Sequence, residues 1–145
     1  MIRIICVGKI KENYLNELIN DYLKRINKYH KIDIIEVKDN ENILKESENI
    51  LKYINSTDYN IALTIDGNNY DSISFANHIN SIFNHNSNIT FIIGSSNGID
   101  NSVLDKCIEK ISFSKLTFPH GLFRGILLEQ IYRAFKINNN ETYHK

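Results

Sequence analysis

The loop Gly94–Gly98, with the sequence Gly-Ser-Ser-Asn-Gly, combines residue types that let a ligand come close to the backbone. Glycine tolerates a positive φ, and small side chains leave backbone N–H and C=O groups accessible. The loop follows Ile89–Ile93, a β-branched and aromatic run that predicts a strand buried on both faces. It lacks the glycine spacing of a Rossmann fingerprint and the lysine of a P-loop. Taken alone, the pattern favours a plain strand-to-helix connection over a ligand site.

A second stretch of interest, Ile111–Phe118, is rich in apolar residues and runs into Pro119, the only proline of the chain. Proline biases the residue before it towards an extended backbone and suits the first turn of a helix. Apolar residues then recur at helical spacing and predict a helix over Leu122–Phe135. Loops at the ends of buried strands are where α/β proteins usually bind ligands, so this stretch and the glycine loop form one candidate site.

Strand and helix patterns alternate along the rest of the chain. Further strands are predicted at Ile2–Val7, Ile32–Val37 and Asn60–Ile65, and further helices over Tyr14–Ile26, over 39–55 and after Asp71 or Ser72. The sequence Asp66–Asn69 is a strong turn signal and is expected to end the third strand. His78 and His85 are expected at the surface of the helix that follows. The alternation predicts an α/β fold with a largely parallel sheet flanked by helices, in a single domain over residues 1–145.

The charge balance argues against a protein that grips nucleic acid unaided. The chain carries 17 basic and 17 acidic side chains, whereas such proteins usually have a basic excess. Cys6 and Cys107 show no metal-binding spacing, so no metal is expected. No apolar run is long enough to cross a membrane and no secretory signal is recognisable, so we expect a cytoplasmic protein.

Several segments in a fixed order resemble the bacterial 23S rRNA pseudouridine-N3 methyltransferase family of the SPOUT superfamily. They are IRIICVGKIKENY and YLKRINKYHKIDIIEV near the N-terminus, then FIIGSSNG, ISFSKLTFPH, LLEQIYRAFKI and the terminal YHK. Each motif is short, but the ordered set covers essentially the whole chain. The resemblance implies a SPOUT fold whose C-terminal segment threads through a loop to form a trefoil knot. General rules of chain connection would not predict that topology.

The resemblance also implies an activity and a cofactor. The family transfers a methyl group from S-adenosyl-L-methionine to N3 of a pseudouridine in 23S rRNA, here expected on the ribosome or its large subunit. Matching the cofactor motifs residue by residue gives Leu63, Gly94, Phe113, Ser114, Lys115, Leu116, Thr117 and Phe118. Apolar side chains beside accessible backbone groups suit an adenine. Ser95 stands where the family usually has a second glycine, and a left-handed φ there would cost about 1–2 kcal/mol.

For the transfer step, the resemblance points to the C-terminal tail. N3–H must lose its proton, which requires a base or a cation that stabilises the developing anion. The candidates are His144 and Arg133, with His120 as a further one, while Tyr143 could stack on a base or donate a hydrogen bond. The alternatives are a frayed tail and, for Arg133, a purely structural ion pair with Glu129 four residues earlier.

The resemblance further implies a homodimer. The apolar arc of the helix Leu122–Phe135 is wider than one sheet would cover, and Gly125 would permit close approach of another backbone. Two other classes of function stay open at this point. One is a non-catalytic nucleotide-binding module of the flavodoxin-like or Rossmann-like kind, and the other is a ribosome-associated protein without methyl transfer.

Overall fold

Strands and helices alternate along residues 1–145 in the computed structural model, as the hydrophobic pattern predicts. The strands are β1 (Ile2–Val7), β2 (Ile32–Val37), β3 (Tyr59–Asn69), β4 (Ile89–Ile93) and β5 (Glu109–Ser112). The helices are α1 (Asn13–Ile26), α2 (Ile43–Leu51), α3 (Ser72–Phe83), α4 (Asn101–Leu104) and α5 (His120–Asn138). All five strands are parallel and form one sheet in the order β2-β1-β4-β3-β5. This confirms the α/β fold with a parallel sheet.

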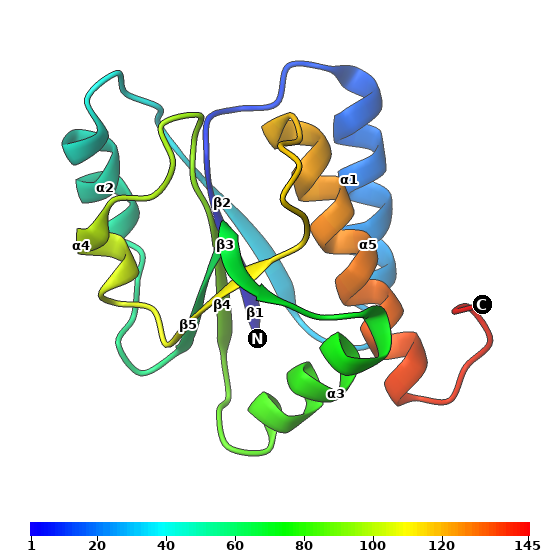
Figure 1. Ribbon diagram of the computed structural model, residues 1–145. Coiled ribbons are helices and arrows are strands. Elements are labelled where there is room, and N and C mark those ends of the chain that lie inside the picture. Colours follow the sequence, from blue (N-terminus) through cyan, green and yellow to red (C-terminus); the bar gives the residue numbers. More distant parts are fainter.

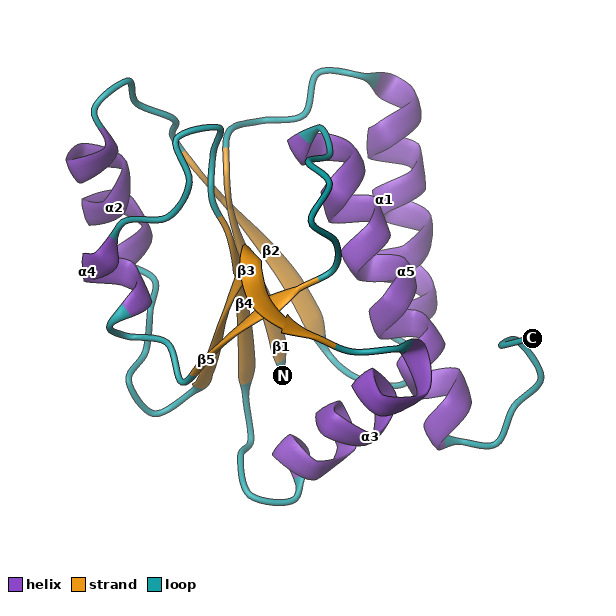
Figure 2. Cartoon of the chain, in the orientation of Figure 1, coloured by secondary structure: helices purple, strands orange, loops and turns teal.

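Helices cover both faces of the sheet. Helices α1, α3 and α5 pack together on one face, and the shorter α2 and α4 lie on the other (Figures 1 and 2). Successive side chains of a strand point to opposite faces, so Ile4 and Cys6 of β1 join the larger core while Ile5 and Val7 join the smaller one. Strand β4 is buried along its whole length, as its composition predicts. Strand order does not describe how the chain threads, so the trefoil knot stays a prediction.

The helix boundaries follow their capping residues. Asp71 caps α3 with a capping box, in which its side chain accepts from the Ser74 N–H at 2.7 Å. Helix α2 begins only after Asn42, whose side chain accepts from the Leu44 N–H at 2.9 Å. The predicted helix over 39–55 was therefore too long at both ends.

The expected turn at Asp66–Asn69 was wrong, because β3 continues through it. The register with β5 shifts at this point, so that Ile111 pairs with both Leu63 and Asn68 around a β-bulge. A Cβ on Gly67 would lie 2.7 Å from the backbone of Ile111. The glycine is there because two strands approach closely, which is the other common use of glycine in a strand.

His78 was also predicted wrongly. It is 23% exposed, forms a hydrogen bond with Glu109 of β5 through Nε2 and stacks on Tyr70, with ring centroids 5.0 Å apart. His85 is exposed, as predicted. His78 thus helps to hold the edge strand β5 against α3.

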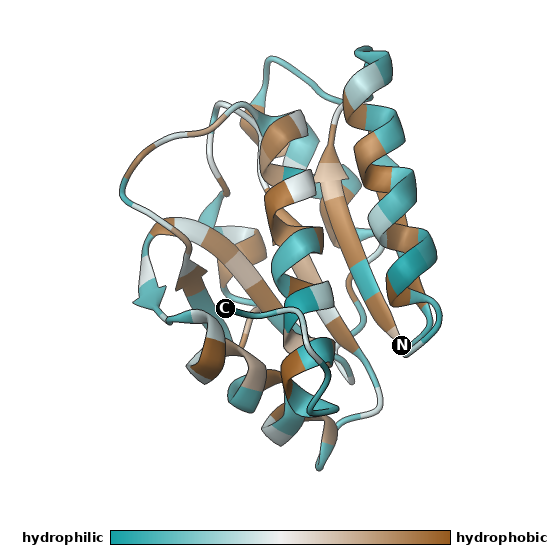
Figure 3. Cartoon of the chain, turned by 90° about the vertical axis from the view of Figure 1, so that its right-hand side faces the viewer, coloured by the Kyte–Doolittle hydropathy of each residue, from teal (hydrophilic) through white to brown (hydrophobic).

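Helix α5 packs beside α1 along most of its length (Figure 3). Gly125 does allow a close approach, but the neighbour is the Leu18 side chain of the same chain. A Cβ added at Gly125 would lie 2.8 Å from Cδ2 of Leu18. Much of the wide apolar arc is therefore covered by α1 and α3. Leu122 remains 39% exposed and Ile126 half-buried. Near the beginning of α5, these two apolar side chains are therefore accessible to a partner.

Candidate functional site

A cavity of about 570 Å³ lies at the carboxyl ends of β4 and β5 and beside the middle of β3, where β3 stops pairing with β4. These ends carry the two loops that the sequence singles out, one after β4 and one between β5 and α5 (Figure 2). Seven of the eight predicted cofactor residues line the cavity: Leu63, Gly94, Phe113, Ser114, Leu116, Thr117 and Phe118. Its neighbours Ser114 and Leu116 line the cavity, but Lys115 itself does not, and its side chain is exposed. The structure thus brings together segments 19 or more positions apart.

The glycine loop is held in a tight hairpin-like turn. Ser95 and Gly98 form an isolated bridge, and the Gly98 N–H donates to the Ser95 carbonyl at 2.9 Å. Gly98 has a φ of 80°, whereas Ser95 is not in the left-handed region. The serine therefore causes no backbone strain. A Cβ on Gly94 would lie 2.6 Å from the Gly98 carbonyl oxygen, so a larger residue at 94 would force this loop apart.

The loop between β5 and α5 is anchored by aromatic side chains. Phe113 packs edge-on against Phe75 and Phe123, with ring centroids 5.7 and 5.4 Å away. Phe118 stacks on Phe123 at 6.2 Å. Within the loop, Ser114 Oγ accepts from the Leu116 N–H at 3.0 Å. The anchored ends leave the middle of the loop, including the 71% exposed Leu116, as one wall of the cavity.

The residues present fit an adenosine-like ligand. The walls are mainly apolar, with Ile93 and Ile99 beside the predicted residues. Thr64 Oγ1, also in the wall, is buried and forms no hydrogen bond of good geometry, although it lies close enough to the Asp66 carboxylate to help lower the pKa of that group. The hydroxyl oxygen keeps its capacity to accept a hydrogen bond. Apolar walls with a few convergent polar groups are typical of a small-molecule site rather than of a phosphate cradle.

Sequence reasoning missed Thr64, Asp66 and Ser96, all of which line the cavity. The signal was available, because each lies within three positions of a predicted residue at the carboxyl end of a strand. His120, the additional candidate for proton removal, also lines this cavity.

The C-terminal tail forms a separate cluster on α5. Arg133 pairs with Glu129, and its Nη1 lies 3.0 Å from Nδ1 of His144. The Tyr143 hydroxyl donates to Glu129 at 3.2 Å, and the guanidinium carbon of Arg133 lies 4.8 Å from the centre of the Tyr143 ring. The ion pair with Glu129 is thus present, and Tyr143 and His144 contact side chains of α5.

Two pKa shifts follow from this packing. Burial and the neighbouring Tyr22 and Glu129 raise the pKa of the Tyr143 phenol, so it stays protonated at neutral pH. Hydrogen bonds to Glu129 raise the pKa of the Arg133 guanidinium further above its usual value. Tyr143 is therefore a hydrogen-bond donor and Arg133 a fixed positive charge, so of these three residues only His144 has a ring nitrogen that can accept a proton.

The tail cluster and the cavity do not meet within one chain. None of the residues that line the 570 Å³ cavity belongs to the tail, and Arg133, Tyr143 and His144 are absent from its walls. The structure brings the three predicted catalytic residues together with one another, but not with the predicted cofactor residues.

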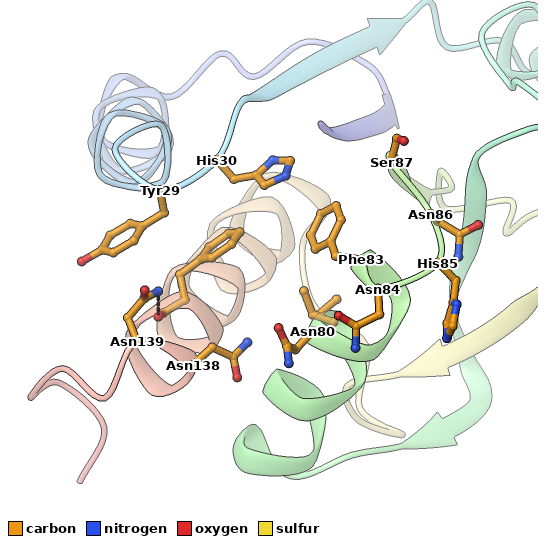
Figure 4. A pocket seen from close by; sticks show the side chains of 12 residues that line it. Tyr29, His30, Asn80, Phe83, Asn84, His85, Asn86, Ser87, Asn138 and Asn139 are labelled. Atoms are coloured by element: carbon orange, nitrogen blue, oxygen red, sulfur yellow. Dashed lines mark hydrogen bonds between the residues drawn. The ribbon is translucent and has the colours of Figure 1, made fainter.

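A second cavity, of about 690 Å³, lies at the other end of the strands, near the amino ends of β2 and β4 (Figure 4). His30 stacks on Phe83 in its wall, with centroids 4.5 Å apart, and several asparagine side chains form the rim. It includes none of the predicted site residues. Since ligands of open parallel sheets bind at the carboxyl ends of the strands, the smaller cavity is the better candidate despite its size.

The structure contains no group of three or more His, Cys, Asp or Glu residues that could hold a metal ion. None of its helices is both long and apolar enough to span a membrane.

Comparison with known proteins gives one consistent result. The family model described as "Predicted SPOUT methyltransferase" matches residues 1–144. The chain is 48% identical over 157 residues to a putative ribosomal RNA large subunit methyltransferase H from Methanococcus maripaludis, and 46% identical over 156 and 157 residues to ribosomal RNA large subunit methyltransferases H from Malacoplasma penetrans and Clostridium tetani. Each match covers 99% of both chains.

Among solved structures, a probable methylase family protein from Haemophilus influenzae superposes with a TM-score of 0.59 at 15% identity. The match covers 99% of this chain and 70% of that one. At this identity the likeness concerns the fold alone.

Proposed function

The chain belongs to the SPOUT methyltransferase family, and we propose that it transfers a methyl group from S-adenosylmethionine to N3 of a pseudouridine in 23S rRNA. The relatives that it matches over nearly their full length are named as methyltransferases of large-subunit ribosomal RNA. The chain is therefore an rRNA methyltransferase rather than a non-catalytic nucleotide-binding module. The observation that carries the proposal is the cavity at the carboxyl ends of β4 and β5 and the middle of β3, which collects seven of the residues matched to the family's cofactor motifs.

In this proposal the cavity binds the methyl donor. Leu63, Ile93 and Leu116 offer apolar contacts to an adenine, and the Thr64 hydroxyl oxygen offers a hydrogen-bond acceptor. Gly94 leaves the loop after β4 free of side-chain bulk at its beginning. S-adenosylmethionine supplies an activated methyl group, so the protein's main contribution is to hold the donor and the target nitrogen in line.

The tail would act on the RNA base. Arg133 carries a charge that stabilises the anion formed when N3–H loses its proton, and His144 accepts that proton directly or through water. Glu129 fixes the orientation of Arg133 and Tyr143 through hydrogen bonds of 2.9 and 3.2 Å. The Tyr143 ring is available to stack on an unpaired base.

A second copy of the chain would complete the active site. Because the tail does not reach the cavity of its own chain, a homodimer that places the tail of one protomer over the cavity of the other would unite both halves. The exposed Leu122 and the half-buried Ile126, near the cavity end of α5, are where we expect part of this contact.

The substrate is expected to be the assembled ribosome or its large subunit. The chain has no net charge, so it lacks the phosphate neutralisation that would hold free RNA tightly. Shape and protein contacts on the ribosome would then supply the grip. An enzyme that works on ribosomes is expected in the cytoplasm.

A labelled-methyl assay on ribosomes that lack the modification tests the proposal. We expect incorporation into 23S rRNA at a pseudouridine and little incorporation into a short stem-loop of the same sequence. Equal turnover on both substrates would contradict the ribosome requirement. Calorimetry with S-adenosylmethionine, S-adenosylhomocysteine and NAD tests the cofactor, because a dinucleotide-binding module would prefer NAD.

A further inference from the structure

Glu46 is a buried carboxylate directly behind the cavity wall. It lies in the first turn of α2 and is 2% exposed. No lysine, arginine or histidine forms an ion pair with it. Buried carboxylates are rare unless a cation compensates their charge. The chain itself does not provide that cation.

Hydrogen bonds hold both carboxylate oxygens of Glu46. Ser95 Oγ donates to one carboxylate oxygen, and the Asn40 N–H donates to the other at 3.3 Å. Ser95 Oγ itself accepts from the Asn97 N–H at 3.1 Å, so its own proton is free to point at Glu46. The glycine loop therefore fixes one oxygen of Glu46, and the backbone before α2 fixes the other.

This charge is one hydrogen bond away from the ligand space. Ser95 and its neighbour Ser96 both line the 570 Å³ cavity, whereas Glu46 lies behind Ser95. The other acidic residue at the cavity, Asp66, is 75% exposed and paired with Lys110 at 3.2 Å, so solvent and the lysine screen it. His120 is the only basic side chain in the lining. Glu46 thus places a carboxylate, shielded from solvent, behind the loop side of the cavity.

We propose that Glu46, acting through Ser95, makes the cavity prefer a cationic sulfonium cofactor over its neutral thioether product. This inference rests on the proposed function. S-adenosylmethionine and S-adenosylhomocysteine differ only by the methyl group and the positive charge on sulfur. A fixed negative charge that water does not screen stabilises the first and not the second. Glu46 would then be a positioning residue that both favours donor binding and helps the product to leave.

The test is the ratio of two affinities, measured by calorimetry on the full chain. Glu46→Gln keeps the size and the ability to accept from Ser95 but removes the charge. We expect it to weaken S-adenosylmethionine binding about tenfold, or about 1.4 kcal/mol, while S-adenosylhomocysteine binding changes little. Sinefungin, which carries a protonated amine in place of the methyl group, should follow S-adenosylmethionine.

Two control variants separate charge from structure. Glu48→Gln removes an exposed charge from the same helix and should leave the ratio unchanged. Glu46→Asp keeps the charge and should keep most of the preference for the sulfonium. If Glu46→Gln does not fold, Ser95→Ala, which releases the carboxylate from the loop, should lower the same ratio.

The outcomes distinguish this inference from the cofactor proposal. If wild-type protein binds neither S-adenosylmethionine nor S-adenosylhomocysteine, the proposed cofactor is wrong. If wild-type protein binds both and Glu46→Gln weakens both equally, Glu46 only supports the loop and the inference is overturned. An unchanged ratio in a folded Ser95→Ala variant would overturn it as well.

Discussion

The cofactor cavity and the tail cluster divide the site into two differently built regions. The cavity takes short segments from β3, β4 and the loop after β5, and it is formed by backbone, small residues and apolar side chains. The tail cluster takes Glu129, Arg133, Tyr143 and His144 from the last 17 positions, and it is formed by charged and aromatic side chains. The first region should therefore be sensitive to added bulk and the second to loss of functional groups.

The largest effect is expected from added bulk at Gly94. A Cβ there would lie 2.6 Å from the Gly98 carbonyl oxygen and 2.7 Å from Ile99 Cγ1, so Gly94→Val must displace the loop. We expect S-adenosylmethionine affinity to fall at least about a hundredfold, or about 2.7 kcal/mol, while circular dichroism shows the fold intact. Gly121→Ala is the control, since its new Cβ comes within 3.0 Å only of the end of the Leu15 side chain, at 2.8 Å, and makes an ordinary contact with Ile10 at 3.6 Å. Unchanged affinity in folded Gly94→Val would remove this loop from the site.

Deletion of Tyr143, His144 and Lys145 should have the opposite profile. The tail lies outside the cavity, so we expect cofactor affinity within about threefold of wild type while methyl transfer falls at least about a hundredfold, a typical loss for acid–base residues. Removal of Lys145 alone is the control for shortening the chain. Light scattering on the same protein tests whether the dimer persists. Full activity without the tail would return Tyr143 to a structural role, and a monomeric full-length protein would contradict the dimer.

A smaller effect is expected at the bulge that supports the cavity. Gly67→Ala would place a Cβ 2.7 Å from the backbone of Ile111 and Lys110 and push β5 away from β3. Overpacking of this kind costs about 1–3 kcal/mol of unfolding free energy, measurable by urea denaturation. Cofactor affinity should fall with it, because β5 leads into the loop that lines the cavity. A variant as stable as wild type would mean that the strands separate without cost.

The smallest effect is expected for Tyr143→Phe. It removes the hydrogen bond to Glu129 but keeps the ring against Arg133 and against Tyr132, whose ring centre is 4.9 Å away. Stability should fall by about 0.5–1.5 kcal/mol, the usual net value of one hydrogen bond, and turnover by less than about tenfold. Thermal unfolding and the ribosome assay measure the two quantities. A loss as large as that of the full tail deletion would show that the hydroxyl takes part in the chemistry.

The cavity was predictable from sequence because its parts are local signals. The strand Ile89–Ile93 is a continuous apolar run that ends at glycine, and the structure confirms it residue by residue. Helix α5 begins two residues before and ends three residues after the predicted Leu122–Phe135, since capping and packing decide its ends. Lys115 shows the limit of motif matching: a continuous motif includes a position whose side chain points away from the cavity.

Long-range contacts decided what the sequence did not reveal. Gly67 carries a turn signal, and only the position of Ile111, 44 residues later, makes it part of a strand. Glu46 lies in a polar stretch and resembles a solvated helix position, yet Ser95, 49 residues later, covers and holds it. His78 likewise owes its partly buried position to Glu109. Such partners become visible only once the sheet order is known.

One measurement tests most directly the claim that two regions on different copies share the reaction. Gly94→Val protein, whose cofactor loop is displaced, and tail-deleted protein, which lacks Tyr143 and His144, are mixed and assayed for methyl transfer to N3 of the pseudouridine on unmodified ribosomes. The account predicts that each variant alone is nearly inactive and that the mixture regains a substantial part of wild-type activity, because mixed dimers contain one complete site. A mixture as inactive as its components, under conditions where light scattering and tagged copies show that mixed dimers form, would contradict it.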